Sequence, residues 1–259
     1  MSWTEQVFNY CERGLDPSFW AEPINAASNA GFLIAAALAA VALARHGHDG
    51  ARSSTAERVA IWLLIALVAI IGIGSFAFHT FAARWALIAD VAPITIFMIA
   101  YLAYALRMFL QLGWLPVALA VAAFLYVGSF ASSLTCAGHQ VVNGTAEAEP
   151  CFNGSLGYAP ALITLFIVGG IAAKRGLSTG RTLLAAGAIF FVSAIFRTVD
   201  RDVCDMTLML GQVRGTHALW HLLNALTLYL LLLAAIHRRK TQPHWRLEAE
   251  EPASGITPK

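Results

Sequence analysis

Seven long apolar runs are the feature of this sequence that most limits its fold. Each run is close to the roughly 20 residues that a helix needs to cross about 30 Å of hydrocarbon. A soluble domain of 259 residues could not bury so many of them. The sequence therefore predicts an all-α integral membrane bundle of seven transmembrane helices, at residues 25–44, 59–78, 85–106, 113–132, 156–173, 182–199 and 216–236.

The composition and the chain ends fit this architecture. Only 12% of the residues are charged, against roughly 25% in soluble domains. The net charge of +2 is small, and there is neither an internal repeat nor a glycine-rich phosphate loop, so we expect membrane lipids and not nucleic acid as partners. Residues 1–24 lack the features of a cleavable signal peptide and predict an extracytoplasmic segment. The bundle would occupy residues 25–237, and residues 238–259 a cytoplasmic, disordered tail.

Basic residues predict how the bundle is oriented, because Lys and Arg resist translocation across a membrane. With the N-terminus outside and the C-terminus inside, twelve of the 17 basic residues fall in inner segments. The five in outer segments are Arg13, Arg84, Arg197, Arg201 and Arg214. The opposite orientation would reverse this ratio.

All four cysteines then lie in outer segments, which face an oxidising compartment. Cys136 and Cys151 flank the one long outer loop, which leaves Cys11 and Cys204 as the other pair. Of the three possible connectivities we therefore favour Cys136 with Cys151 and Cys11 with Cys204. The alternative is four unpaired small residues packed in the core.

Ionisable and polar side chains in the spans share one depth. The second span ends at His79, and Ser75 lies one turn deeper on the same face, about 6 Å away. The third span begins outside, with Asp90 roughly 7 Å below its start. The seventh span carries His217 in its first turn and His221 one turn deeper. These five residues would form a single layer beneath the outer surface.

Such a layer predicts a catalytic zinc site. Three neutral imidazoles are a familiar zinc ligand set that leaves the fourth tetrahedral position open. His217 and His221 would bind one ion from one helix face, and His79 would complete the site from across the bundle. Asp90 would act on bound water or on a histidine, and Ser75 would donate a hydrogen bond to a developing oxyanion.

Each element also has a simpler interpretation. The histidine pair could lie at the interface with its rings towards water. Asp90 could be a helix-packing acid beside Pro93, and Ser75 could merely let two helices approach closely. For the charged residues that precede the last cysteine we expect a surface salt-bridge group: Arg197, Asp200 and Asp202.

The set Ser-x-x-x-His, then Asp, then His-x-x-x-His resembles the alkaline ceramidase-like membrane hydrolases, seven-span zinc amidases distantly related to the progestin and adiponectin receptors. The matching stretches are "YCERG", "WAEPINAASNAGF", "GSFAFH" and "HALWHLL". The resemblance implies that Zn²⁺ is held by His79, His217 and His221, and that Ser75 and Asp90 complete the active site. It further implies hydrolysis of a ceramide-like lipid amide to a fatty acid and a sphingoid base.

The resemblance also implies a disulfide between the N-terminal segment and the loop before the seventh helix, in agreement with the favoured pairing. A Ca²⁺ site near the N-terminus is a further family feature. The residues at matching places are Asn9, Tyr10 (through its carbonyl), Glu12, Gly14 and Glu22. The alternative is that Glu12 and Glu22 pair with Arg13 or cap the first helix.

We therefore expect a multi-pass zinc amidase, in the cell membrane if the protein is prokaryotic, with its active site towards the extracytoplasmic side. A zinc-containing receptor of the adiponectin-receptor type is the main alternative, because it shares the architecture. A haem protein would need His79 as one axial ligand, since two histidines on one helix face cannot lie on opposite sides of a haem. A retinal protein is excluded, because the seventh span has no lysine for a Schiff base.

Overall fold

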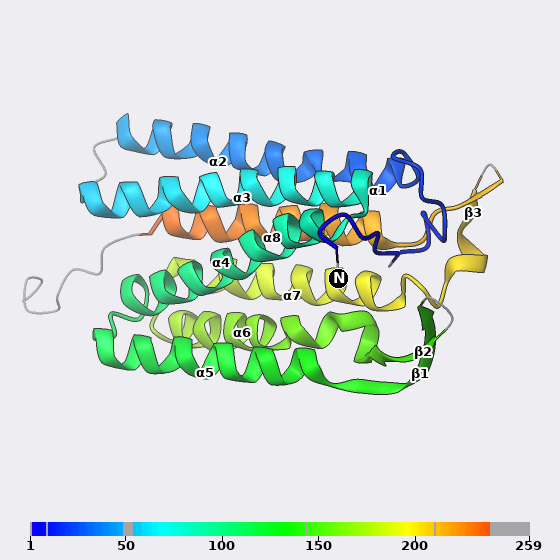
Figure 1. Ribbon diagram of the computed structural model, residues 1–259. Helices are drawn as coiled ribbons and strands as arrows, with labels where there is room; N and C mark the ends of the chain where they lie inside the picture. Colours follow the sequence, from blue (N-terminus) through cyan, green and yellow to red (C-terminus); the bar gives the residue numbers. More distant parts are fainter. Residues whose placement is uncertain (1, 9, 49–53, 143–144, 210, 239–259) are drawn as a thin grey trace, which may run out of the picture.

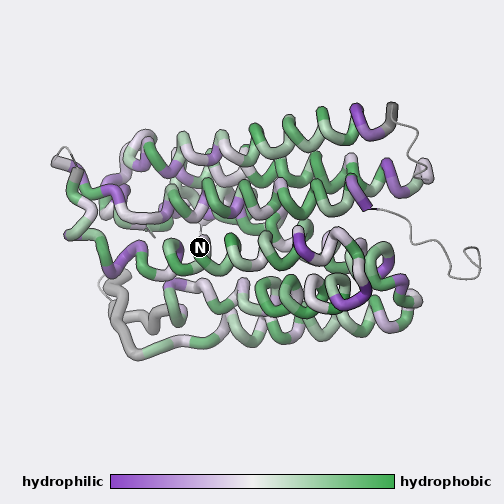
Figure 2. Tube along the Cα trace, turned by 180° about the vertical axis from the view of Figure 1, so that it is seen from behind, coloured by the Kyte–Doolittle hydropathy of each residue, from purple (hydrophilic) through white to green (hydrophobic). Residues whose placement is uncertain are grey.

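A computed structural model describes residues 2–8, 10–48, 54–142, 145–209 and 211–238. Within these residues, seven helices are long and apolar enough to cross a membrane, which confirms the predicted all-α bundle. The helices run alongside one another (Figure 1), and hydrophilic residues gather mostly towards the two ends of the bundle (Figure 2). The predicted tail, from residue 239 onward, lies outside the described residues.

The first span consists of two helices, α1 (Pro23–Ser28) and α2 (Ala30–His48). The other spans are α3 (Thr55–Phe81), α4 (Arg84–Met108), α5 (Trp114–Ser133), α6 (Ala159–Lys174), α7 (Ser178–Val199) and α8 (His217–Ile236). The fifth span also includes the residues from Cys151 that precede α6, and the predicted spans are thus correct to within five residues at each end. The sequence did not indicate that α1 and α2 would be separate.

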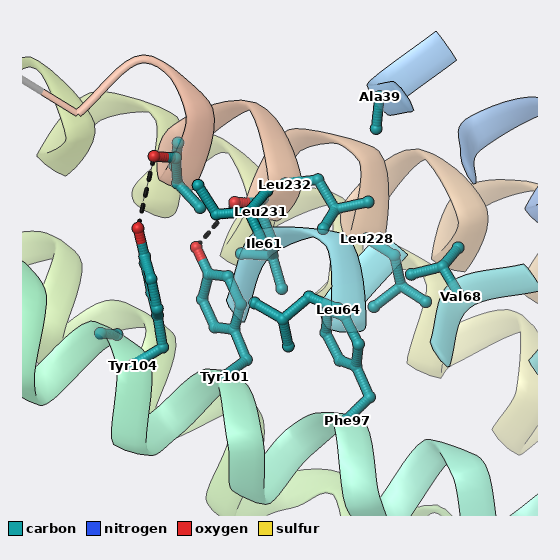
Figure 3. Packing of buried hydrophobic residues seen from close by; sticks show 14 of the residues in the cluster. Ala39, Ile61, Leu64, Val68, Phe97, Tyr101, Tyr104, Leu228, Leu231 and Leu232 are labelled. Carbon is teal, nitrogen blue, oxygen red and sulfur yellow. Dashed lines mark hydrogen bonds between the residues drawn. The ribbon is translucent and has the colours of Figure 1, made fainter. Parts of the chain in front are cut away.

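The hydrophobic core surrounds α8, the most buried of the seven spans, which packs against α1, α2, α3 and α7. Figure 3 shows apolar side chains of α3, α4 and α8 in mutual contact within this core. Two tyrosines of α4 also reach α8. The hydroxyls of Tyr101 and Tyr104 donate to the carbonyls of Leu231 (2.9 Å) and Ala235 (3.4 Å), so these buried polar groups are satisfied.

Helices α3 and α4 approach each other closely at Gly74. A Cβ atom at this position would clash with the backbone carbonyl of Ala89 and would lie 3.2 Å from the amide nitrogen of Asp90. The close approach therefore requires glycine. It brings together Ser75 and Asp90, the residues that follow Gly74 and Ala89 in their helices.

Outside the spans, the described residues include two short antiparallel hairpins and two 3₁₀ helices. The elements are β1 (Thr135–Val142), β2 (Thr145–Pro150), η1 (Cys151–Tyr158), η2 (Cys204–Thr207), β3 (Leu208–Met209) and β4 (Gln212–Val213). Both hairpins lie at the end of the bundle where α8 begins (Figure 1).

Two disulfides join the cysteines as predicted. Cys11 is bonded to Cys204, with their Cα atoms 5.4 Å apart, and Cys136 to Cys151, at 4.8 Å. All four cysteines thus belong to segments at one end of the bundle (Figure 1). That this end faces an oxidising compartment remains a prediction.

Candidate active site

Three histidines from two helices meet at this end of the bundle. His79 lies near the end of α3, and His217 and His221 lie one turn apart at the start of α8. Their candidate ligand atoms all lie within 4.8 Å of one another. All three side chains are buried, so none of the rings points towards lipid or water. They form a group that could hold one metal ion.

In two of the histidine rings, Nδ1 has a hydrogen-bond partner that fixes the tautomer. His79 Nδ1 lies 2.5 Å from Glu22 Oε2, which as a carboxylate oxygen accepts the hydrogen bond. His221 Nδ1 lies 2.7 Å from the hydroxyl of Ser28. That hydroxyl donates its own hydrogen to the carbonyl of Asn25, so it accepts from the ring. Both rings therefore carry hydrogen on Nδ1 and present a bare Nε2, the form in which a histidine binds metal.

Two other ring nitrogens are buried without a partner: His79 Nε2 and His217 Nδ1. An unsatisfied buried polar group costs roughly 1–3 kcal/mol, so two of them in one group of histidines require an explanation. A metal ion would satisfy both. The donor set of three neutral imidazoles fits zinc and leaves a coordination position for a reactant.

Ser75 and Asp90 lie beside the histidines. Both are buried, and the close approach of α3 and α4 at Gly74 brings them together. They line a cavity together with His217 and His221. The structure thus brings the predicted catalytic pair into the same chamber as the histidines of α8.

This chamber adjoins a second, apolar cavity. The two cavities share four lining residues: Ile71, Ile94, Tyr158 and Asn224. The lining of the second cavity comes mainly from α4, α6, α7 and α8 and is almost entirely apolar. A molecule with a polar group and a hydrocarbon chain could therefore occupy both cavities at once.

A model of the ceramidase family matches residues 4–252. The chain belongs to the ceramidase family. A comparison with curated protein sequences found no match. Membership confirms the resemblance noted in the sequence, and it supports a ceramidase-like hydrolase that acts on the amide bond of a lipid.

In this ceramidase family member an aromatic ring covers the histidines, and the sequence did not indicate this contact. The ring of Tyr10 stacks on His217, with centroids 3.8 Å apart and planes at 25°. Its centroid also lies 5.1 Å from that of His79. Burial is the main reason that the pKa of this phenol is raised above its usual value. Tyr10 therefore stays neutral beside the histidines.

Arg197 and Asp200 do not form the surface salt-bridge group that we expected, and this prediction was wrong. Asp200 is completely buried, and its carboxylate accepts the backbone N–H groups of Cys11 (3.2 Å), Thr216 (2.6 Å) and His217 (2.9 Å). It thereby caps α8 from another helix. Arg197 lines the polar chamber. No local pattern could reveal the capping role, because the N-cap residue of α8 itself is Thr216.

The residues implied for a Ca²⁺ site have other partners. Glu12 accepts the N–H groups of Ile24 (2.9 Å) and Asn25 (2.7 Å) at the start of α1, and pairs with Arg214 (3.1 Å). The carbonyl of Tyr10 accepts the N–H of Gly14 (3.2 Å).

Glu22 pairs with Arg13 at 2.6 Å, and Asn9 lies outside the described residues. The capping and pairing interpretation of Glu12 and Glu22 therefore fits the structure better than a calcium site. In the described part of the chain, the three histidines are the one group of His, Cys, Asp or Glu side chains arranged to hold a metal.

Proposed function

We propose that this protein is a zinc-dependent intramembrane amidase that hydrolyses ceramide, or a related N-acyl lipid, to a fatty acid and a sphingoid base. The observation that carries the proposal is the meeting of three buried imidazoles, two of them with orphaned ring nitrogens, beside a buried Ser75 and Asp90 pair. Membership of the ceramidase family supports the same substrate class.

The chain's own residues would divide the chemistry between them. His79, His217 and His221 would hold zinc, which as a Lewis acid supplies an activated water and polarises a carbonyl. Asp90 would accept the proton of the attacking water and pass it to the leaving amine. Ser75 would donate a hydrogen bond to the oxygen of the amide carbonyl as negative charge develops there.

The two adjoining cavities suit a lipid amide. The amide would lie in the polar chamber, against Asp90 and Ser75, while a hydrocarbon chain extended into the apolar cavity. Burying such a chain contributes favourable free energy, about 0.8 kcal/mol for each methylene group removed from water. For a substrate that arrives from the bilayer this gain is smaller, so the cavity would mainly position the amide bond.

The test is a metal and turnover assay on the purified protein. We expect about one zinc per chain, release of fatty acid from ceramides or other N-acyl lipids, and loss of that activity on chelation. His217→Ala should abolish metal binding and hydrolysis together. His237→Ala is a matched control, because His237 is exposed at the far end of the same helix. Zinc without turnover on any N-acyl lipid would favour the receptor alternative, and turnover without metal would refute the mechanism.

A further inference from the structure

Arg13 is a buried cation in a cage of oxygens. Its side chain has no exposed surface. It donates to one carboxylate oxygen and four backbone carbonyls: Glu22 Oε1 (2.6 Å), Asp16 O (3.1 Å), Ser18 O (2.8 Å), His79 O (3.0 Å) and Thr80 O (3.3 Å). Every nitrogen of the guanidinium therefore has at least one partner.

The cage is electrostatically suited to one positive charge. Burying a guanidinium costs several kcal/mol unless it is paired and fully hydrogen-bonded. Glu22 supplies a full negative charge. The carbonyls of His79 and Thr80 belong to the last turn of α3, where carbonyls lack helical partners and the helix dipole is negative. A cation is thus required here by the acid and by the helix end alike.

The same ligand chemistry is what Ca²⁺ selects, because it binds carboxylate and carbonyl oxygens. In this chain Glu22, one of the two acids implied for calcium, is already paired with Arg13. Glu12, the other acid, accepts from the start of α1 and pairs with Arg214. The structure therefore disagrees with the calcium site that the family resemblance implies. Arg13 supplies the positive charge that calcium would otherwise supply.

The cage is connected to the metal centre through Glu22. One carboxylate oxygen of Glu22 accepts from Arg13, and the other accepts from His79 Nδ1 (2.5 Å) and Asn25 Nδ2 (3.1 Å). Arg13 holds the Glu22 carboxylate in place, and the carboxylate in turn fixes the ring orientation and tautomer of His79. Partners of this kind typically change metal affinity 10–100-fold when removed.

We propose that Arg13 is the permanent cation of this cage, that it positions His79 through Glu22, and that the protein is consequently independent of calcium. Arg13 is a positioning residue, not a catalytic one. The link to zinc rests on the proposed function, whereas the filling of the cage does not.

The first experiment uses the purified wild-type protein and needs no lipid substrate. Thermal unfolding is followed with millimolar Ca²⁺ and with a calcium-selective chelator, and terbium luminescence, excited through tryptophan, reports occupation of any calcium-type site. We expect the same unfolding temperature in both solutions and no saturable luminescence. The proposal would be overturned if Ca²⁺ raised the unfolding temperature, or Tb³⁺ raised the luminescence, in a saturable way that Glu22→Gln removes.

The second experiment removes the internal cation. Arg13→Ala should lower the unfolding temperature and weaken zinc binding about 10–100-fold, and free guanidinium ion at low concentration should restore part of both. Arg13→Lys keeps the charge but offers a single nitrogen, so its zinc affinity should fall between those of Arg13→Ala and the wild type.

Arg45→Ala is the matched control, because Arg45 is exposed on α2 and makes no contact with the cage. It should leave zinc affinity and unfolding temperature unchanged. If Arg13→Ala did not fold, Arg13→Lys would carry the measurement. Undiminished zinc binding and unfolding temperature in the Arg13 variants would refute the positioning role. If only the amidase proposal failed, lipid turnover would be absent, but the Arg13 variants would still lower zinc affinity and unfolding temperature as described.

Discussion

Asp90 is the one acidic side chain among the residues that line the polar chamber, and its surroundings suit a proton carrier. It is 8% exposed, so bulk water competes little for it. The other ionisable side chains that line the chamber include Arg197 and the two imidazoles of α8. A carboxylate in this position can exchange a proton with a reactant without first displacing a solvent shell.

We expect Asp90→Asn to retain zinc and to lower kcat by about 10²–10⁴, because the amide has the shape of the acid but cannot take a proton. Metal analysis and lipid hydrolysis on the same preparation check this. Asp202→Asn serves as control, since Asp202 is exposed at the same end of the bundle. If zinc were lost in Asp90→Asn, Asp90 would be a metal ligand and not the base.

At this scale the sequence was informative about the histidines, and it offered the pairing of Glu22 with Arg13 only as an alternative to a calcium site. His217 and His221 are one turn apart, and Ser75 and His79 likewise, so helical periodicity and depth in the membrane indicated a common layer. Asp200 and Arg13 gave no such signal. Arg13 contacts the end of α3, 66 residues away, and Asp200 contacts Cys11 across 189 residues. Only the folded chain reveals such pairs.

Among the elements, the contact between α3 and α4 decides the geometry of the active site. Gly74 lets the two backbones touch, and its neighbour Ser75 then meets Asp90. The alternative interpretation of Ser75 was that it merely permitted close approach. Instead the neighbouring glycine does so, which leaves the serine hydroxyl free for chemistry.

Gly74→Ala should therefore separate α3 from α4 and displace Ser75 from Asp90. Overpacking of this kind costs about 1–3 kcal/mol, so we expect a lower unfolding temperature together with reduced kcat. Gly170→Ala, inside α6, is the matched control, because a Cβ there would meet nothing within 4 Å. Its helix should be unchanged or slightly stabilised. Wild-type hydrolysis by Gly74→Ala would show that the chamber tolerates the shift.

The spans were predictable because a helix that crosses hydrocarbon must be long and apolar, with all backbone groups paired internally, and such helices are visible as apolar runs in the sequence. The β1 and β2 hairpin has no comparable apolar run. Its strands are short, and the disulfide of Cys136 with Cys151 joins its ends. Nor did hydropathy reveal the separation of α1 from α2 at Asn29, because apolar residues continue on both sides.

For the whole molecule, the distribution of charge and sulfur predicts which end faces outward. The disulfides and the active site share one end of the bundle (Figure 1). Twelve of the 17 basic residues belong to the segments predicted to lie inside. Both patterns follow if the active-site end is extracytoplasmic.

This orientation can be tested by labelling intact cells with a membrane-impermeant maleimide. The described residues contain no free cysteine, so the native chain gives a low background. We expect Met206→Cys, which is 76% exposed in the wild type, to react in intact cells. Arg45→Cys, exposed at the other end, should react only after the cells are opened. The reverse pattern would place the active site at the cytoplasmic face.

The attachment of residues 10–13 also determines when the site can be completed during synthesis. Tyr10 stacks on His217, Cys11 bonds to Cys204 and Glu12 pairs with Arg214, all of which leave the ribosome at least 190 residues later. At about 5–20 residues per second, the start of the chain waits roughly 10 to 40 s for these partners. In a nascent or truncated chain Tyr10 therefore cannot yet cover the three histidines, and the candidate site is complete only in a finished molecule.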